Sequence, residues 1–280
     1  MQMRIRKELK MFQKAHKSLS KARLCIAGPA GSGKTYTSLL IGSGLGNRIA
    51  MIDTERGSGA LYSDLLDYDI LQLSPPFECK KYIEGIKEAE NQGYDVIIVD
   101  SLTHAWAGEG GLLDMKDKIA QSGKANDWTS WRFVTPLHNQ LVEAILQSKA
   151  HIIFTARSKM KYAPEEDNGR IKKVRKLGLD PILREGMEYE FTIVFDLSNE
   201  HIATSTKDRT SLFDGQFFMP GKETGQKILS WLKQGSNDQH DPVCTKPESN
   251  SQKDMKELDK FVDESFSGTK RVRPVSAFNK

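Results

Sequence analysis

Short apolar runs alternate with longer amphipathic stretches through the middle of this chain. The apolar runs, whose length and composition are typical of buried strands, cover residues 22–27, 48–53, 94–100, 151–156 and 191–197. Mixed charged and apolar residues at helical spacing predict helices between them, located after Lys34, over 77–91, near 111–120, over 127–148 and over 222–234. Because central strands that are apolar throughout are buried on both faces, the alternation predicts an α/β fold with a mainly parallel central sheet flanked by helices.

Weaker patterns add three further elements. A short strand over 70–73 stops before Pro75 and Pro76, and the residues 180–190 predict a helix. Residues 202–206 are expected to return beside the strand at 191–197 as a hairpin.

The two ends of the chain differ from its middle. Residues 1–20 read as a basic amphipathic helix, and residues 235–280 are rich in Asn, Asp, Ser and Pro, a composition typical of a flexible tail. We therefore expect one domain over 21–234 with an N-terminal helix and a polar C-terminal tail.

Net charge and cysteine content indicate the protein's cellular environment more than its function. The formal net charge is +4, which is mildly basic and selects no partner by itself. Cys25, Cys79 and Cys244 are far apart and form no C-x-x-C pair, which argues against a disulfide framework or a zinc site. No run of about 18 apolar residues occurs, so we expect no membrane segment and a cytoplasmic protein.

The first chemical signature is a glycine-rich loop directly after the first predicted strand. Residues 28–35 (GPAGSGKT) match G-x-x-x-x-G-K-[ST] at every fixed position. Glycines let successive backbone N–H groups turn toward phosphate oxygens, and the helix that follows adds the positive end of its dipole. In such a loop Lys34 would reach the terminal phosphates, and the hydroxyl of Thr35 would bind Mg²⁺. The loop predicts ATP and Mg²⁺ as ligands, with nucleotide contacts from Gly28, Pro29, Ala30, Gly31, Ser32, Gly33, Lys34, Thr35, Thr37 and Arg157.

Acidic residues end two of the predicted strands. Asp100 follows four apolar residues and is expected to hold Mg²⁺ through water, although a simple strand-end cap would look the same. Asp53 and Glu55 follow the second strand. Hydrolysis needs a group that activates water, so Glu55 is the expected catalytic base, and Thr35, Asp100 and Asp53 form the expected metal set.

These motifs and their order resemble the RecA-like ATPases over residues 22–234. In that family the second strand ends in a similar acidic tip whose glutamate activates water, a position that Glu55 matches, and residues 96–101 (VIIVDS) look like the family's magnesium strand. The family's next strand usually ends in a glutamine sensor, whereas this chain has Arg157 there, which is expected to contact the γ-phosphate or DNA.

The resemblance also implies residues that act between subunits, and it implies partner molecules. Lys207 and Arg209 form a K-x-R pair like the one that reaches a neighbouring subunit's γ-phosphate in hexameric helicases of this type, although a solvated turn is the plainer interpretation. A trans-acting pair implies a homo-oligomer, either ring or filament. The overall layout most resembles the small phage-encoded Sak-type recombination ATPases, which implies single-stranded DNA and a single-strand-binding protein as partners, in recombination, annealing or replication in the host cytoplasm.

A basic segment supports the nucleic-acid interpretation. Residues 157–176 combine eight basic residues with three acidic ones, Glu165, Glu166 and Asp167, which are placed to mark the tip of a hairpin. Contacts to phosphates are expected, with a tyrosine stacking on a base, from Lys159, Lys161, Tyr162, Arg170, Lys172, Lys173, Arg175 and Lys176. A solvated loop is the alternative.

The loop after Asp100 carries weaker signals. Trp106 is a candidate for base stacking, whereas Trp128 and Trp131, at helical spacing, are expected in the core. His104 is expected to satisfy a local hydrogen bond rather than to take part in chemistry.

Two other functions fit the same motifs. A nucleotide-gated assembly module would bind ATP with negligible turnover, and its function would survive Glu55→Gln. A small-molecule P-loop kinase would use residues 157–176 as a lid, but the acidic tip at Asp53 and Glu55 fits a water activator better.

Overall fold

The computed structural model describes residues 15–17, 20–167 and 170–234, and within 160–167 and 170–179 it describes the backbone alone. The chain divides into Met1–Asn237 and Asp238–Lys280, and every described residue belongs to the first unit. The expected tail over 235–280 and most of the expected helix over 1–20 lie outside the described residues.

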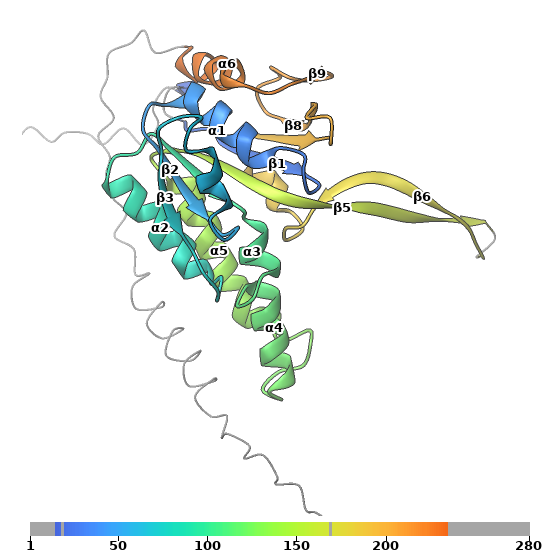
Figure 1. The fold of residues 1–280 in the computed structure, drawn as a ribbon. Coiled ribbons are helices and arrows are strands. Elements are labelled where there is room, and N and C mark those ends of the chain that lie inside the picture. The colour runs from blue at the N-terminus through green and yellow to red at the C-terminus, as the bar shows by residue number, and fades with distance from the viewer. Residues whose placement is uncertain (1–14, 18–19, 168–169, 235–280) are drawn as a thin grey trace, which may run out of the picture. The chain divides into compact units, whose positions relative to one another are not determined.

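Strands alternate with helical segments in the first part of the described chain, and three consecutive helices then precede the long fifth strand (Figure 1). The elements up to the middle of the chain are β1 (Arg23–Gly28), α1 (Lys34–Leu45), β2 (Ile49–Asp53), the 3-10 turn η2 (Ser58–Tyr62), β3 (Asp69–Gln72), α2 (Cys79–Asn91), β4 (Val96–Asp100) and α3 (Thr103–Ala107). They are followed by α4 (Leu112–Gln121), α5 (Trp131–Gln147), β5 (His151–Asp167), β6 (Arg170–Pro181), the 3-10 turn η3 (Met187–Glu190), β7 (Ile193–Leu197), β8 (Ala203–Asp208), β9 (Phe217–Phe218) and α6 (Lys222–Lys233).

The central sheet is mixed but mostly parallel, in the order β3-β2-β4-β5-β1-β7-β8-β9. Neighbours from β3 to β7 pair in parallel, and β8 and β9 continue the sheet antiparallel. This confirms the predicted fold class and the hairpin after β7. Because parallel strands share one direction, the carboxyl ends of β2, β4, β5 and β1 meet at a single edge, where ligands bind in such folds.

Helices cover both faces of the sheet (Figure 1). Successive residues of β4 belong to two different hydrophobic clusters. Val96 and Ile98 pack with residues of α1 and α6, whereas Ile97 and Val99 pack with residues of α2 and α5. All four side chains have no exposed surface. Alternate side chains of a strand point to opposite faces, so the apolar run that predicted β4 is explained by burial on two sides.

Helices α1 and α6 approach each other closely enough to require glycine. A Cβ atom at residue 225 would lie 2.1 Å from the carbonyl oxygen of Ile41, and one at residue 44 would lie 2.1 Å from the carbonyl oxygen of Lys222. The backbone contact brings α6, near the end of the described chain, against the helix that follows the glycine-rich loop.

Strand β5 continues well beyond the sheet. It pairs with β1 up to Arg157, and from Ser158 onward it pairs only with β6, in a long antiparallel hairpin whose turn follows Asp167 (Figure 1). The acidic triplet 165–167 therefore lies at the hairpin tip, as predicted.

The helix predicted over 180–190 is wrong. Strand β6 runs through Pro181, and the N–H of Ile182 donates to the carbonyl oxygen of Arg157 at 2.7 Å, which keeps the chain extended. Gly186 then adopts a left-handed φ of 89°, and only Met187–Glu190 forms a 3-10 turn. Pairing with β5 overrides the local helical pattern.

The tryptophan predictions are partly wrong. Trp128 is 84% exposed, while Trp131 is half-buried against the core and stacks on Trp106 with ring centroids 5.8 Å apart. Trp106 is thus engaged within the domain. Trp128 lies just before α5 begins at Trp131, so the helical periodicity that placed both in the core extends to only one of them.

Among the described helices, none has both the length and the apolar composition needed to cross a bilayer. Cys25 and Cys79 are buried free thiols.

Candidate active site: a phosphate-binding loop beside an acidic strand edge

The glycine-rich loop connects β1 to α1 at the carboxyl edge of the sheet. Gly31 and Gly33 adopt left-handed φ values of 80° and 82°, which side chains other than glycine rarely take. Gly28 is needed for space instead, because a Cβ there would lie 2.4 Å from Ser32 Oγ and 2.9 Å from the carbonyl oxygen of Leu197. The loop therefore has the tight backbone curl that a phosphate cradle requires.

Lys34 begins α1 and reaches back across this loop. Its Nζ donates to the carbonyl oxygen of Pro29 at 2.7 Å. Burial lowers the pKa of Lys34, while the nearby carboxylates of Asp100 and Glu55 raise it. The ammonium group of Lys34 is held over the phosphate cradle by an uncharged carbonyl oxygen. A negatively charged phosphate oxygen would be a stronger partner for it.

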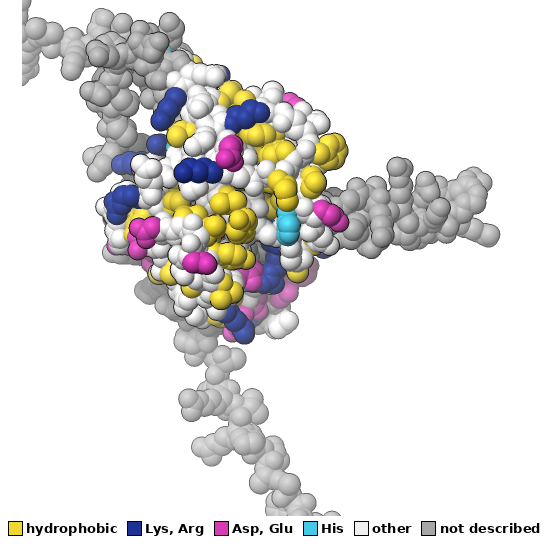
Figure 2. All heavy atoms as spheres, turned by 45° about the horizontal axis from the view of Figure 1, so that its top comes forward, with side chains coloured by type: hydrophobic (Ala, Val, Ile, Leu, Met, Phe, Trp, Pro, Cys, Tyr) yellow, Lys and Arg dark blue, Asp and Glu magenta, His cyan; other side chains and the backbone are white. Residues whose placement is uncertain are grey.

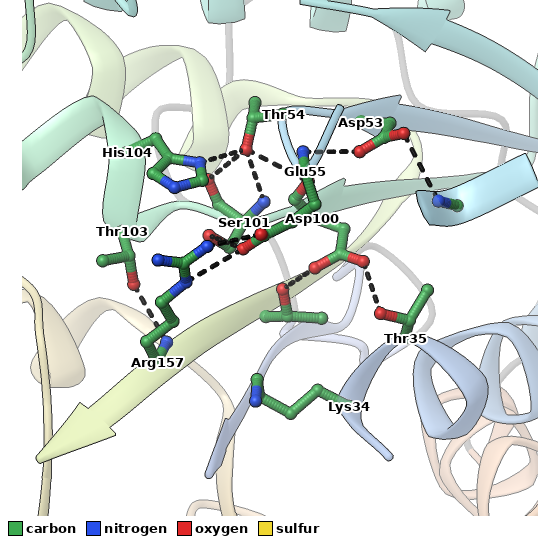
Figure 3. A network of polar contacts seen from close by, with 12 residues as sticks. Lys34, Thr35, Asp53, Thr54, Glu55, Asp100, Ser101, Thr103, His104 and Arg157 are labelled. Atoms are coloured by element: carbon green, nitrogen blue, oxygen red, sulfur yellow. Dashed lines mark hydrogen bonds and ion pairs between the residues drawn. The ribbon is translucent and has the colours of Figure 1, made fainter. Parts of the chain in front are cut away.

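Thr35 and Asp100 form a direct pair (Figure 3). Thr35 Oγ1 donates to Asp100 Oδ2 at 2.6 Å, and Thr155, at the end of β5's core portion, donates to Asp100 Oδ1. Burial raises the pKa of Asp100, and the two hydroxyl donors oppose that rise. Asp100 is only 2% exposed, so it is positioned by its neighbours rather than by solvent.

This oxygen pair fits Mg²⁺. A hydroxyl and a carboxylate are hard donors of the kind that Mg²⁺ takes from protein, with water and phosphate oxygens completing its octahedron. The described residues contain no cluster of three or more His, Cys, Asp or Glu side chains suited to a metal. A site built from two protein oxygens therefore suits a metal that arrives with a nucleotide.

Asp53 supports the loop that carries Glu55. It lies beside Asp100 in the β2–β4 register, and its two oxygens accept the N–H groups of Glu55 at 2.6 Å and Gly59 at 3.3 Å. Both oxygens thus bind backbone donors (Figure 3). The structure gives this predicted metal ligand a role in shaping the turn into η2.

Thr54 fastens the ends of β2 and β4 together. Its N–H donates to the carbonyl oxygen of Asp100 at 2.7 Å, and its hydroxyl accepts the N–H of Ser101 at 2.8 Å. The same hydroxyl lies 2.7 Å from His104 Nδ1, which confirms that His104 satisfies a local hydrogen bond. These hydrogen bonds therefore fix the backbone directly before Glu55.

Glu55 is paired with Arg157 on both of its oxygens. Arg157 Nε donates to Oε1 at 3.0 Å and Nη2 donates to Oε2, while Ser101 Oγ donates to Oε1 at 3.3 Å (Figure 3). Burial raises the pKa of Glu55, but the hydrogen bond and charge of Arg157 outweigh it, so the pKa lies below its usual value. The expected water activator is ionised and held by a guanidinium.

Lys34, Thr35, Glu55, Asp100 and Arg157 border a cleft of about 1110 Å³. That volume is ample for a nucleotide, since small-molecule sites usually occupy roughly 300–1,000 Å³. Several lining residues were not predicted from the sequence. They come from α1, the η2 turn, β5, the end of β6, the turn after β7 and the segment before α6: Tyr36, Ser58, Tyr62, Ser158, Ile182, His201, Met219 and Pro220. Tyr36 and Ser158 had a signal in the sequence, because they adjoin the glycine-rich motif and Arg157.

Comparison with known protein families agrees with this geometry. A family model described as an AAA domain matches residues 20–226. This chain belongs to that AAA domain family. The assignment indicates a nucleotide-dependent ATPase with a P-loop, in which Mg²⁺ usually accompanies the nucleotide. A search of the curated proteins found no match to the chain. The narrower likeness to Sak-type recombination ATPases stays a prediction.

The AAA domain keeps Lys207 and Arg209 away from its own cleft. Lys207 Nζ donates to the carbonyl oxygens of Glu188 and Tyr189 at 2.8 and 2.6 Å, and Arg209 Nη2 donates to that of Tyr189 at 2.6 Å. Neither residue lines the cleft around the glycine-rich loop.

The predicted DNA-binding residues lie along the hairpin of the AAA domain. Lys159, Lys161 and Tyr162 are on β5, and Arg170, Lys172, Lys173, Arg175 and Lys176 are on β6. In the backbone register Tyr162 is opposite Lys176, and Glu165 is opposite Lys173. They form a single two-stranded element joined to the cleft through Arg157.

Proposed function

We propose that this AAA domain is a Mg²⁺-dependent ATPase that acts on single-stranded DNA, in recombination, annealing or replication of the phage type. One observation carries the proposal. Strand β5 places Thr155 against Asp100 and Arg157 in the cleft, and it then continues into the basic hairpin without a break. A single strand thus links the nucleotide site to a surface suited to a polyanion.

The chain's own residues account for hydrolysis. The N–H groups of the loop and Lys34 bind the phosphates. Glu55 accepts a proton from a water molecule while the oxygen of that water bonds to the γ-phosphorus. At the same time the bond between the γ-phosphorus and the β–γ bridging oxygen breaks. Thr35 and Asp100 would hold Mg²⁺, which when bound neutralises charge on the phosphate oxygens. The products are ADP and phosphate.

The hairpin supports a contact with nucleic-acid backbone. Residues 157–176 carry eight basic and three acidic residues, and phosphate contacts of this kind supply affinity without reading sequence. Elsewhere, on the face drawn in Figure 2, described lysines and arginines are spaced apart among hydrophobic and acidic side chains.

The deciding experiment measures ATP turnover of the full chain with and without single-stranded DNA, alongside DNA binding at several salt concentrations. We expect DNA to raise turnover and affinity to fall steeply with salt, because counterions are released from the phosphates. No stimulation together with no salt-sensitive binding would remove the DNA assignment and leave the ATPase. Duplex DNA of the same sequence is the matched comparison.

A further inference from the structure

The expected catalytic base is not free in this structure. Arg157 contacts both oxygens of Glu55, through Nε at 3.0 Å and through Nη2. Such a charge-assisted fork is the strongest common arrangement of a carboxylate with a cation. A carboxylate held in this way is a weaker base toward water, because the guanidinium charge stabilises its ionised form and occupies one acceptor site on each oxygen.

Arg157 lies where the sheet becomes the hairpin. It is the last β5 residue in register with β1, opposite Gly28 of the glycine-rich loop, and the next residue, Ser158, is already paired with Pro181 of β6. Its carbonyl oxygen accepts the N–H of Ile182 on the returning arm at 2.7 Å, and its N–H donates to Thr103 Oγ1 at 2.9 Å. A shift of either hairpin arm would therefore move Arg157.

The ion pair between Arg157 and Glu55 is charge-assisted, and both side chains are partly exposed to solvent. The Arg157 side chain is 48% exposed and the Glu55 side chain 24% exposed, so water can replace the contact at modest cost. Ser101, which also donates to Glu55, belongs to the rigid end of β4 rather than to the hairpin. Arg157 is thus the partner of Glu55 whose position depends on the hairpin.

We propose that Arg157 is a latch that holds Glu55 away from its catalytic role and releases it when a nucleic-acid strand binds the β5–β6 hairpin. The proposal rests on the proposed function for the identity of the hairpin's ligand. Arg157 is a positioning residue here, since it acts through Glu55. It differs from a γ-phosphate contact, in which removal of Arg157 would slow the reaction.

The test compares Arg157→Gln and Arg157→Lys with the unmodified full chain, measuring kcat and KM for ATP with and without single-stranded DNA. We expect Arg157→Gln to raise the DNA-free kcat about tenfold, the rate equivalent of removing one charge-assisted hydrogen bond. KM should stay within about twofold, and stimulation by DNA should shrink toward none. Arg157→Lys, which keeps the charge but cannot form the fork, should give an intermediate DNA-free rate.

Two controls separate a latch from general damage. Arg132→Gln removes an exposed arginine on α5 that does not line the cleft and should change neither rate. In a Glu55→Gln background the Arg157→Gln change should have no effect on kcat, because the residue it holds is gone. A fluorescent ATP analogue and thermal melting establish that each variant binds nucleotide and is folded.

The outcomes distinguish this proposal from the proposed function. An unchanged or lower DNA-free kcat in Arg157→Gln that binds nucleotide overturns the latch. If Arg157→Gln fails to fold, the same criterion applies to Arg157→Lys. A raised DNA-free rate in a protein whose unmodified form ignores DNA overturns the DNA assignment and keeps the latch.

Discussion

At the scale of single residues, neighbouring acids at the sheet edge have opposite environments. Asp100 is buried and its pKa is raised by burial, whereas Glu55 is partly exposed and its pKa is lowered by Arg157 against the effect of burial. Asp100 is surrounded by hydroxyl donors that suit a metal-bound water, and Glu55 is exposed enough to meet a substrate water. The roles follow from surroundings rather than from residue type.

The first prediction concerns Glu55. Replacing it by Gln keeps the shape but removes the base, so kcat for ATP should fall by roughly 10²–10⁴-fold, while the affinity for an ATP analogue stays unchanged. Steady-state turnover and equilibrium binding measure the two quantities. Glu84→Gln, on an exposed position of α2, is the control. Unchanged biological function in Glu55→Gln would favour the nucleotide-gated assembly module.

The second prediction concerns Asp196 on β7. Burial raises its pKa to about 6, with a further contribution from Asp180, and its Oδ1 has no hydrogen-bond partner among the described residues. Because the folded pKa lies above the unfolded value of about 3.9, this group lowers stability as pH rises from about 4 to 6, and the deficit persists above pH 6.

Asp196→Asn should therefore raise the melting temperature at pH 8 by roughly 2–6 °C and leave it unchanged near pH 4. Thermal melts at both pH values test this. The same substitution at an exposed aspartate, Asp214→Asn, is the control. An equal shift at pH 4 and pH 8 would show that packing, not ionisation, is responsible.

At the scale of secondary-structure elements, the cleft depends on close helix packing beneath it. Helix α1 is fixed to the sheet by Leu39 and Ile41 and to α6 by the contact between Gly44 and Gly225. Since α1 carries Lys34 and Thr35 at its first turn, the α1–α6 contact determines how the cradle faces the β2 and β4 ends.

The third prediction tests that contact. Gly225→Ala places a Cβ 2.1 Å from a backbone oxygen that cannot move alone, so it should destabilise the fold by about 1–3 kcal/mol. Gly42→Ala, on α1 itself, is the matched control: its Cβ would meet only side-chain carbons at 3.4 Å or more. There the gain in helix propensity of about 0.5–1 kcal/mol should offset any crowding. Chemical denaturation measures both.

The fourth prediction concerns the hairpin. Replacing Lys172, Lys173, Arg175 and Lys176 by Ala should reduce the slope of log affinity against log salt for single-stranded DNA, by about 0.7 for each phosphate that the variant no longer neutralises. DNA-free ATP turnover should persist, because Lys173, Arg175 and Lys176 pair in the backbone register with residues 162–165, beyond the part of β5 that reaches the cleft. Replacing three lysines and one arginine at exposed helical positions, Lys87, Lys118, Lys227 and Arg132, is the control. An unchanged salt slope would place the DNA elsewhere.

At the scale of the whole molecule, one domain supplies most of a hydrolytic site but keeps its K-x-R pair elsewhere. Lys207 and Arg209 are bound to backbone oxygens of residues 188 and 189, outside the cleft. We propose that they complete the cleft of a neighbouring copy of the chain, as the resemblance to RecA-like oligomers implies.

The fifth prediction is complementation between inactive variants. Lys34→Ala should abolish nucleotide binding in its own cleft, and Arg209→Ala should remove the cation that reaches into the neighbour's cleft. Mixed subunits would include interfaces with both parts intact, so the mixture should regain ATP turnover above the sum of the separate variants. A mixture of Lys34→Ala with Glu55→Gln should regain none that depends on this interface, since both changes affect the same cleft. No recovery in the first mixture would exclude trans action by Arg209.

The sequence by itself determined the parts that depend on neighbouring residues. The glycine spacing of residues 28–35 dictates the loop, and the apolar runs that became β1, β2, β4 and the first part of β5 mark buried strands whose order predicts a parallel sheet. From these the meeting of Thr35 and Asp100 follows, because parallel strands end at one edge. Such features were predictable because local backbone geometry and burial on both faces leave direct marks in the residue pattern.

Only the tertiary structure decided what depends on distant partners. Pairing with β5 kept residues up to Pro181 extended where a helix was expected, and folding brought Glu55 to Arg157 across 102 residues of sequence. It also placed His201, Met219 and Pro220 in the cleft and directed Lys207 away from it. No local periodicity carries these facts, because the energy of a contact between remote residues exists only once the chain has brought them together.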